Sequence, residues 1–187
     1  MASYVQTEMF HRPFPITNTE YQNLPLPQSL FVYGTLRTDL GPPSMRGDLP
    51  ADNSIGYAYL PYAKMYSVGS AYPAVVPSDN HEDVVHGQIL SYEDYSEGDW
   101  KHILSGLDSY EGVPSLYTRE LVNVTLSKKY VAFDEATTAD VWTYVYARGV
   151  DPLTPIENGD WKVHYEEIIS RGRDEMAGMF ESAQEER

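Results

Sequence analysis

Six short runs rich in β-branched and aromatic residues are spread along the chain, and they constrain its fold more than any other feature. Runs of this kind predict β-strands. The last run gives the strongest signal, because Val141, Thr143 and Val145 alternate with aromatic residues at the period of two expected for a strand. The runs cover residues 30–33, 55–60, 63–68, 84–92, 116–126 and 141–147.

One strong helical pattern lies between the fourth and fifth of these runs. Trp100, Leu104 and Leu107 recur at steps of three and four residues, so their side chains are expected to form one apolar stripe that packs on the sheet. Asp99 is the expected N-cap. The Gly-Val-Pro turn that begins at Gly112 is expected to end the helix.

Many short strands with one strong helix predict an α+β fold, with a sheet of about six strands that curls toward a barrel. The chain of 187 residues is long enough for one domain with a core. We expect an extended N-terminal arm over residues 1–29, the domain over 30–162 and a helical tail over 163–187. A polar connector over 127–140 is expected to separate the last two strands.

The N-terminal arm combines prolines with apolar residues. Prolines at positions 13, 15, 25 and 27 exclude a long regular element. Its apolar side chains, which include Phe10, Phe14, Ile16 and Tyr21, favour packing on the domain or on a partner subunit over a free tail.

Composition excludes several classes of function. The formal net charge of -15 disfavours nucleic acid, because affinity for phosphate backbones rests on Lys and Arg. The chain has no cysteine, which excludes disulfides, thiol catalysis and thiolate metal sites. No stretch approaches the roughly 18 apolar residues that span a bilayer, and the N-terminus lacks a basic segment followed by an apolar run. The sequence therefore predicts no membrane partner and a cytoplasmic location.

Glu111 is the first candidate for chemistry, because a carboxylate at a helix C-terminus opposes the helix dipole and local stability does not explain it. One interpretation is a solvent-facing acid on the last helical turn. The other is a general acid or base. Asp108, three residues earlier, either raises the pKa of Glu111 by like-charge repulsion or bonds elsewhere on the helix face or in a loop.

Two further segments have the composition of a binding site. Tyr33-Gly34-Thr35-Leu36-Arg37 follows the first strand, and its backbone N–H groups either hold an anionic group or simply end the strand at Gly34. The run over residues 72–77 is rich in proline and is either a rigid pocket wall or a surface crossing.

The histidine and serine patterns predict no metal and no cofactor. The five histidines lack metal-ligand spacing such as H-E-x-x-H. The serines lack a G-x-S-x-G elbow, and no glycine-rich phosphate loop is present.

The order and spacing of several motifs resemble the γ-glutamylcyclotransferase-like family, in the branch of the AIG2-like proteins and γ-glutamylamine cyclotransferase. The resemblance covers about residues 30–161. It is carried by Phe31-Val32-Tyr33-Gly34-Thr35-Leu36-Arg37, Tyr72-Pro73-Ala74-Val75-Val76-Pro77, His86-Gly87, Leu107-Asp108-Ser109-Tyr110-Glu111-Gly112-Val113-Pro114-Ser115-Leu116-Tyr117-Thr118-Arg119, Trp142-Thr143-Tyr144-Val145-Tyr146 and Ile156-Glu157-Asn158-Gly159-Asp160-Trp161.

This resemblance implies a compact mixed β-barrel flanked by helices and an enzyme that needs neither metal nor cofactor. Glu111 matches the catalytic acid/base, which would close a γ-glutamyl amine, amino acid or isopeptide into 5-oxoproline and release the amine. Tyr117 matches a pocket residue, and Arg119 follows it either in the pocket or paired with an acid of the fold. The substrate loop matches Tyr33, Gly34, Thr35 and Leu36. The alternative is a catalytically silent module that binds a small ligand or a protein on the same fold.

Overall fold

The computed structural model describes residues 27–40, 54–127 and 138–185, with side chains described as far as Arg173. Most of the predicted N-terminal arm and the centre of the predicted 127–140 connector lie outside these ranges. The last strand begins at Thr138, so the final residues assigned to that connector belong to the sheet.

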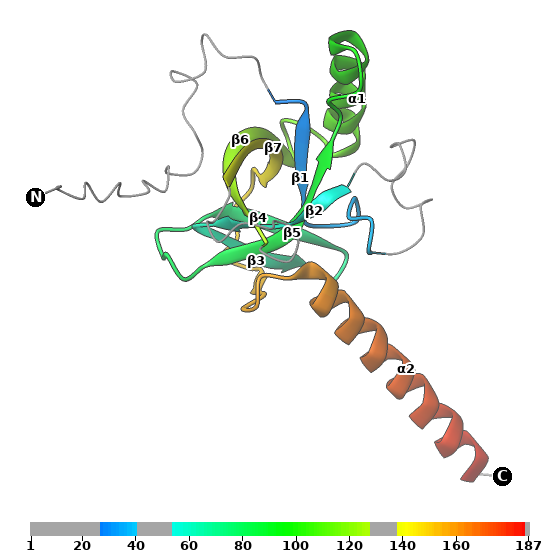
Figure 1. The fold of residues 1–187 in the computed structure, drawn as a ribbon. Coiled ribbons are helices and arrows are strands. Elements are labelled where there is room, and N and C mark those ends of the chain that lie inside the picture. Colours follow the sequence, from blue (N-terminus) through cyan, green and yellow to red (C-terminus); the bar gives the residue numbers. More distant parts are fainter. Residues whose placement is uncertain (1–26, 41–53, 128–137, 186–187) are drawn as a thin grey trace, which may run out of the picture.

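Five strands close into a mixed barrel, which confirms the predicted α+β barrel class (Figure 1). Around the barrel they follow the order β1 (Ser29–Val32), β5 (Val84–Ser91), β2 (Ser54–Pro61), β6 (Tyr117–Leu126) and β7 (Thr138–Tyr146). Four neighbouring pairs are antiparallel. The barrel closes at the parallel pair β1–β7, where Leu30 lies opposite Trp142 and the Thr143 hydroxyl donates to the Phe31 carbonyl over 3.0 Å.

Three strands form a separate sheet beside the barrel, which is why the barrel has five strands and not the predicted six. Its order is β4 (Tyr72–Pro77), β3 (Ala63–Val68) and β8 (Thr154–Pro155). The proline-rich run that the sequence left as a wall or a crossing is therefore a strand. It pairs only with β3, and an edge strand tolerates proline because one of its sides needs no ladder hydrogen bond.

The strand β1 is buried on both faces, which explains its unbroken apolar sequence. Phe31 packs into the barrel interior with Val122 and Val141. The alternate residues Leu30 and Val32 face outward into a second cluster that contains the apolar stripe of the helix beside the barrel.

That helix, α1 (Glu97–Tyr110), buries Trp100, Leu104 and Leu107 as predicted. Its N-cap is Ser96 and not Asp99: the Ser96 hydroxyl oxygen accepts from the Asp99 N–H over 3.2 Å. The Asp99 carboxylate accepts in turn from the Ser96 hydroxyl over 2.6 Å. Asp99 is thus the third residue of the first turn, where its negative charge also suits the helix dipole.

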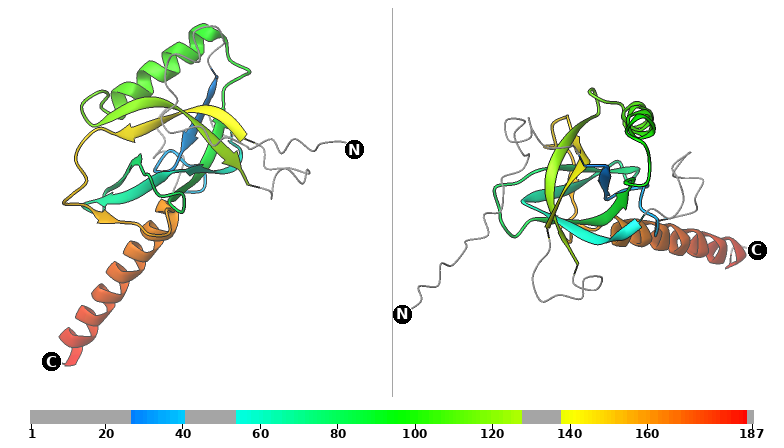
Figure 2. Two further views of the ribbon diagram at one scale, coloured as in Figure 1. Left: turned by 90° about the vertical axis from the view of Figure 1, so that its left-hand side faces the viewer. Right: turned by 45° about the horizontal axis from the view of Figure 1, so that its top comes forward.

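A second helix, α2 (Trp161–Glu185), begins two residues before the predicted helical tail and extends away from the barrel (Figures 1 and 2). Its first residue is part of the barrel core, since the Trp161 side chain is 1% exposed and packs in the same cluster as Phe31. Among the described residues no helix is both long and apolar enough to cross a membrane.

Candidate active site

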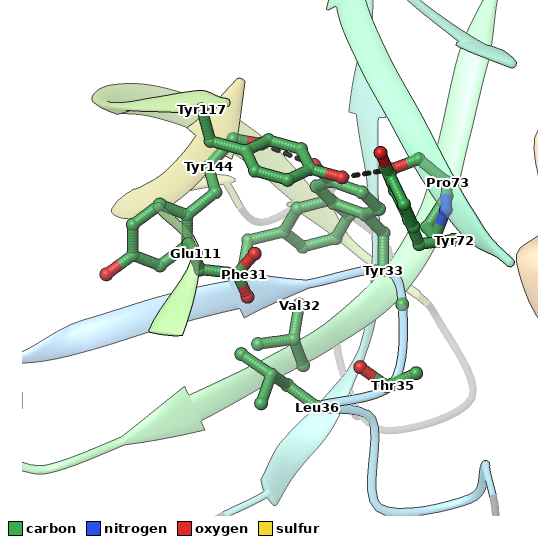
Figure 3. Close-up of a pocket in the computed structure, with 11 residues that line it drawn as sticks. Phe31, Val32, Tyr33, Thr35, Leu36, Tyr72, Pro73, Glu111, Tyr117 and Tyr144 are labelled. Atoms are coloured by element: carbon green, nitrogen blue, oxygen red, sulfur yellow. Dashed lines mark hydrogen bonds between the residues drawn. The ribbon is translucent and has the colours of Figure 1, made fainter. Parts of the chain in front are cut away.

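A pocket opens where the end of β1, the start of β4, the end of α1 and the strands β6 and β7 meet (Figure 3). All six residues that the sequence singled out as catalytic or substrate-binding line it: Tyr33, Gly34, Thr35, Leu36, Glu111 and Tyr117. In the view of Figure 3, Glu111 lies on one side of the pocket and Tyr72 with Pro73 on the other. The fold therefore brings together segments that are far apart in the sequence.

The end of α1 fixes the position of Glu111. Glu111 is the C-cap, and its backbone N–H donates to the Leu107 carbonyl over 2.8 Å. Gly112 follows with a φ of 67°, a left-handed conformation that favours glycine and turns the chain away from the helix axis. The carboxyl group of Glu111 is thereby held against the pocket by the helix and by the turn that ends it.

The Glu111 carboxyl group is poised for proton transfer. Burial raises its pKa from 4.5 to about 7, because a charged carboxylate loses hydration in the pocket. The three neighbouring tyrosine hydroxyls donate to other acceptors, and no hydrogen bond to this carboxyl comes from any described residue. Both carboxyl oxygens are therefore available to a ligand.

Three of the four tyrosines that line the pocket donate hydrogen bonds to acceptors other than Glu111. The Tyr33 hydroxyl donates to the Tyr144 carbonyl, the Tyr117 hydroxyl to the Pro73 carbonyl over 2.6 Å and the Tyr144 hydroxyl to Asp108 Oδ1 over 2.9 Å. Burial raises the pKa of all three phenols, and the nearby Glu111 carboxylate raises each further. These hydroxyls therefore stay protonated near neutral pH and act as fixed walls.

Asp108 does not raise the pKa of Glu111, which is shifted by burial. The Asp108 carboxylate accepts from Tyr144, and its Oδ1 lies 3.1 Å from Arg119 Nε. The hypothesis of like-charge repulsion is therefore wrong. The Asp108 carboxylate bonds neither along its helix face nor in a loop but to side chains of the barrel strands β6 and β7. Arg119 pairs with an acid of the fold, and its guanidinium also lies 4.9 Å from the centre of the Trp142 ring.

The loop after β1 presents unused backbone donors. The Arg37 N–H donates to the Gly34 carbonyl over 3.0 Å, which closes a tight turn. Among the described residues no acceptor is found for the N–H groups of Thr35 and Leu36 inside that turn. Gly34 also lies close to β4: a Cβ at this position would be 3.0 Å from Pro73 Cγ, so a larger residue would push the loop away from the pocket wall.

Arg37 anchors this loop to the start of α2. Its side chain is only 3% exposed; it makes a two-pronged contact with Asp39 at 2.9 Å and places Nη1 2.7 Å from Asp160 Oδ1. Burial alone would raise the pKa of Asp39, but the Arg37 guanidinium overrides this effect and lowers it. Such a bidentate arginine–carboxylate contact fixes geometry as well as charge.

Sequence reasoning did not assign Tyr72, Pro73 and Tyr144 to the site, although all three line the pocket. The first two belong to the segment for which a pocket wall was one of two interpretations. Tyr144 belongs to the alternating strand pattern, and the alternation does not reveal that its side chain reaches Asp108 on α1 beside the pocket.

Groups of three or more His, Asp or Glu side chains with the geometry of a metal site do not occur within the described residues. Among the described residues the pocket lining contains one carboxyl group and no Lys, Arg or His. Its polar groups are thus a single acid, the hydroxyls of tyrosines and Thr35, and backbone groups.

Comparison with known proteins agrees with this geometry. Residues 30–163 match the sequence profile of the family described as "Gamma-glutamyl cyclotransferase, AIG2-like". The chain is 29% identical over 138 residues to the γ-glutamylcyclotransferase family protein YtfP of Escherichia coli K12, which covers 71% of this chain and 94% of that protein. The YtfP protein of Citrobacter rodentium is 28% identical over 138 residues and covers 71% of this chain and 93% of its own length.

Solved structures show the same fold. The crystal structure of an AIG2-like protein from Mus musculus superposes with a TM-score of 0.50 at 21% identity and covers 71% of this chain and 88% of that one. The solution structure of an Arabidopsis thaliana protein gives a TM-score of 0.50 at 23% identity, with 84% and 95% coverage. By its sequence and its fold, this chain belongs to the AIG2-like γ-glutamyl cyclotransferase family.

Proposed function

We propose that this protein is an enzyme that cyclises the γ-glutamyl group of a small substrate to 5-oxoproline, with Glu111 as general acid and base. The observation that carries the proposal is the carboxyl group of Glu111, whose pKa is raised to about 7 and which receives no hydrogen bond from the described residues. A group with this pKa can accept and return a proton near neutral pH.

The reaction needs few catalytic groups from the protein, because nucleophile and electrophile belong to one substrate molecule. Glu111 takes a proton from the α-ammonium group, and the freed nitrogen forms a bond to the γ-carbonyl carbon. Glu111 then passes this proton to the leaving nitrogen as the bond between that nitrogen and the carbon breaks. The ring nitrogen still carries one proton too many; this second proton passes to the Glu111 carboxylate and from there to the released amine, which departs as an ammonium ion. Confinement of the substrate in a reactive conformation supplies most of the acceleration in such intramolecular reactions.

The loop after β1 supplies hydrogen-bond donors for the anionic oxygens of the substrate. The N–H groups of Thr35 and Leu36 have no acceptor in the described part of the chain. Such amides can stabilise an oxyanion or hold a carboxylate, because backbone amides cannot move away as charge develops. No basic side chain of the described residues lines the pocket. We assign the α-carboxylate or the tetrahedral oxyanion of the substrate to these amides.

Among the described residues the pocket lining has no basic side chain, and this favours a leaving group without net negative charge. Glu111 is an acid in a protein of formal net charge -15, so a leaving group with a net negative charge would meet repulsion without a counter-ion. We therefore propose γ-glutamyl amines and γ-glutamyl-ε-lysine as preferred substrates over γ-glutamyl-glutamate.

The test is incubation with these compounds and with γ-glutamyl-alanine, followed by mass spectrometry of released 5-oxoproline. We expect release from at least one compound, with γ-glutamyl-glutamate the slowest. Tight binding of γ-glutamyl compounds without any release would reject the enzyme and favour a small-ligand binding module on the same fold.

A further inference from the structure

We propose that Tyr72 is a second catalytic residue of the candidate site, whose hydroxyl group donates a hydrogen bond to the γ-carbonyl oxygen of the substrate as that oxygen becomes an oxyanion. The inference rests on the proposed cyclisation and gives a role to a side chain that takes no part in proton transfer. It divides the two anionic groups of the substrate between two sets of donors. The oxyanion lies at Tyr72, and the α-carboxylate lies at the amides of the loop after β1.

The hydroxyl group of Tyr72 is available to a ligand. Four tyrosines line the pocket, and three of them, Tyr33, Tyr117 and Tyr144, donate to acceptors of the protein. The Tyr72 hydroxyl has no hydrogen-bond partner among the described residues. Its ring packs, partly buried, against the apolar cluster that contains Leu36. Because polar groups in such places are normally hydrogen-bonded, an unpaired phenol that lines a pocket indicates a contact with the ligand.

The backbone around Tyr72 holds its ring in place before a ligand arrives. Tyr72 begins β4 directly after a tight turn, in which the Ala71 N–H donates to the Val68 carbonyl over 3.0 Å. Pro73 restricts the backbone of the residue before it to extended conformations. The Pro73 carbonyl is itself fixed by the Tyr117 hydroxyl. A donor positioned in this way costs no reorganisation when charge develops on the substrate.

The geometry of the tetrahedral intermediate separates the oxyanion from Glu111. The carbon under attack carries the attacking nitrogen, the leaving nitrogen, the oxyanion and the carbon chain of the substrate. Glu111 exchanges protons with both nitrogens, so it lies on their side of this carbon, and the oxyanion points to another side. Tyr72 lies across the pocket from Glu111 (Figure 3). It is therefore on the side where the oxyanion forms when both nitrogens face the acid.

The donors of the pocket match the two anionic groups of the substrate. Lys, Arg and His do not occur among the described residues that line it. The N–H groups of Thr35 and Leu36 follow each other in one turn, and successive amides of this kind form a concavity that binds an anion. The Thr35 hydroxyl belongs to the same loop. This loop suits the α-carboxylate, whose charge is permanent, and Tyr72 remains for the oxygen whose charge exists only during the reaction.

Tyr72 acts without transferring its proton. As the lone pair of the α-nitrogen forms the bond to the γ-carbonyl carbon, the π electron pair of the carbonyl moves onto oxygen. The hydrogen bond from the phenol strengthens with this negative charge. The electron pair returns to re-form the carbonyl when the bond to the leaving nitrogen breaks. Because the hydrogen bond is stronger in the transition state than in the bound substrate, its loss lowers kcat more than it raises KM.

The first test is Tyr72→Phe, which removes the hydroxyl group and keeps the ring. With the γ-glutamyl compound that wild type converts fastest, we expect kcat to fall about 10²-fold. KM should change by less than about threefold, and Tm should stay the same because no partner in the described part of the chain loses a hydrogen bond. Tyr66→Phe is the control, since Tyr66 lies on β3 of the same sheet, is partly buried and does not line the pocket. It should keep wild-type kinetics.

Three results would overturn this role of Tyr72 and leave the proposed function standing, because wild type still releases 5-oxoproline in each. The first is unchanged kinetics in Tyr72→Phe. The second is a raised KM with unchanged kcat, which would place the hydroxyl at the α-carboxylate. The third is an equal fall of kcat in Tyr66→Phe, which would indicate an effect of the sheet as a whole. Wild type that releases no 5-oxoproline would overturn the proposed function and this inference together.

A second measurement replaces the γ-carbonyl oxygen of the same substrate with sulfur. Sulfur accepts hydrogen bonds more weakly than oxygen, so the thioamide gains less from the phenol. We expect Tyr72→Phe to lose less than about tenfold in kcat with the thioamide, against about 10²-fold with the amide. Glu111→Gln should lose about the same factor with both substrates, because its protons pass between nitrogens. Equal losses of Tyr72→Phe with the two substrates would show that its hydroxyl does not contact this atom and would overturn the inference.

Discussion

The Tyr117 hydroxyl donates to the Pro73 carbonyl over 2.6 Å and thereby ties the barrel strand β6 to β4 of the smaller sheet across the pocket. Both residues line that pocket. This buried hydrogen bond therefore helps to fix the distance between the two sheets at the pocket.

Tyr117→Phe keeps the ring and leaves the buried Pro73 carbonyl without its donor. An unsatisfied buried acceptor costs about 1–3 kcal/mol, which for a domain of this size lowers Tm by several degrees. We also expect KM to rise, because the pocket wall is less constrained. Thermal unfolding and steady-state kinetics check both effects. Tyr110→Phe is the control, since Tyr110 is 60% exposed, and equal effects in the two variants would contradict the assigned role.

Glu111→Gln is expected to lower kcat by roughly 10²- to 10⁴-fold, because the amide has nearly the same shape but does not carry the proton. The fold should be unaffected or slightly stabilised, since a negative charge is removed from a helix C-terminus. The measurement pairs 5-oxoproline release with thermal unfolding, and the exposed Glu93→Gln serves as control. Full activity in Glu111→Gln would refute the mechanism, whereas a large fall in Tm would mark Glu111 as structural.

The pH dependence of activity should follow the ionisation of Glu111. The general base is the carboxylate, and the pKa of about 7 means that kcat/KM should rise about tenfold per pH unit below pH 7 and level off above it. A profile that is flat from pH 5 to 8 would contradict this assignment.

The pH dependence of stability should have the opposite sign. Between pH 4.5 and about 7 the unfolded chain has released the Glu111 proton and the folded protein still holds it. The unfolded state therefore binds fewer protons, and the contribution of Glu111 to the free energy of unfolding falls as pH rises through this window. Glu111→Gln lacks this dependence, so its Tm should match wild type below pH 4.5 and exceed it increasingly up to pH 7. A difference in Tm that does not change with pH would argue against the raised pKa.

Arg37→Lys keeps the charge but loses the fork that contacts Asp39 and Asp160. We expect kcat/KM to fall at least tenfold, because the loop that carries the Thr35 and Leu36 amides loses its anchor. Arg171→Lys is the control, since Arg171 is 77% exposed and makes only an ion pair with Glu167 on α2. Equal activity of the two variants would show that the anchor does not act on the site.

Much of this architecture could be predicted from the sequence, because the signals were local. The apolar stripe of α1 and the Gly112 turn act within a few residues, so helix and stop were found. The N-cap was misplaced because Ser96 and Asp99 bond to each other and only one of them caps. The number of strands in the barrel could not be predicted, because β3 has the same composition as the barrel strands. It lies in the other sheet because it pairs with β4.

In the candidate site, too, the residues in local motifs could be predicted and those brought in by long-range contacts could not. Glu111 and the Tyr33–Leu36 loop stand in recognisable motifs, whereas Tyr72, Pro73 and Tyr144 enter the pocket only through contacts between distant strands. The raised pKa of Glu111 has the same origin: the sequence suggested Asp108 as its cause, but burial by the assembled pocket produces it.

The start of α2 gives the molecule a built-in lever arm. Trp161 is embedded in the barrel core, and Asp160 accepts a hydrogen bond from Arg37 of the loop after β1. The helix therefore begins at the same contacts that anchor this loop beside the pocket. Its 25 residues extend about 37 Å at 1.5 Å per residue. A tilt of a few degrees at the base is magnified along this length into a displacement of a few ångströms near Glu185. A fluorescent label there would report, from outside the catalytic pocket, small rotations that begin at its edge.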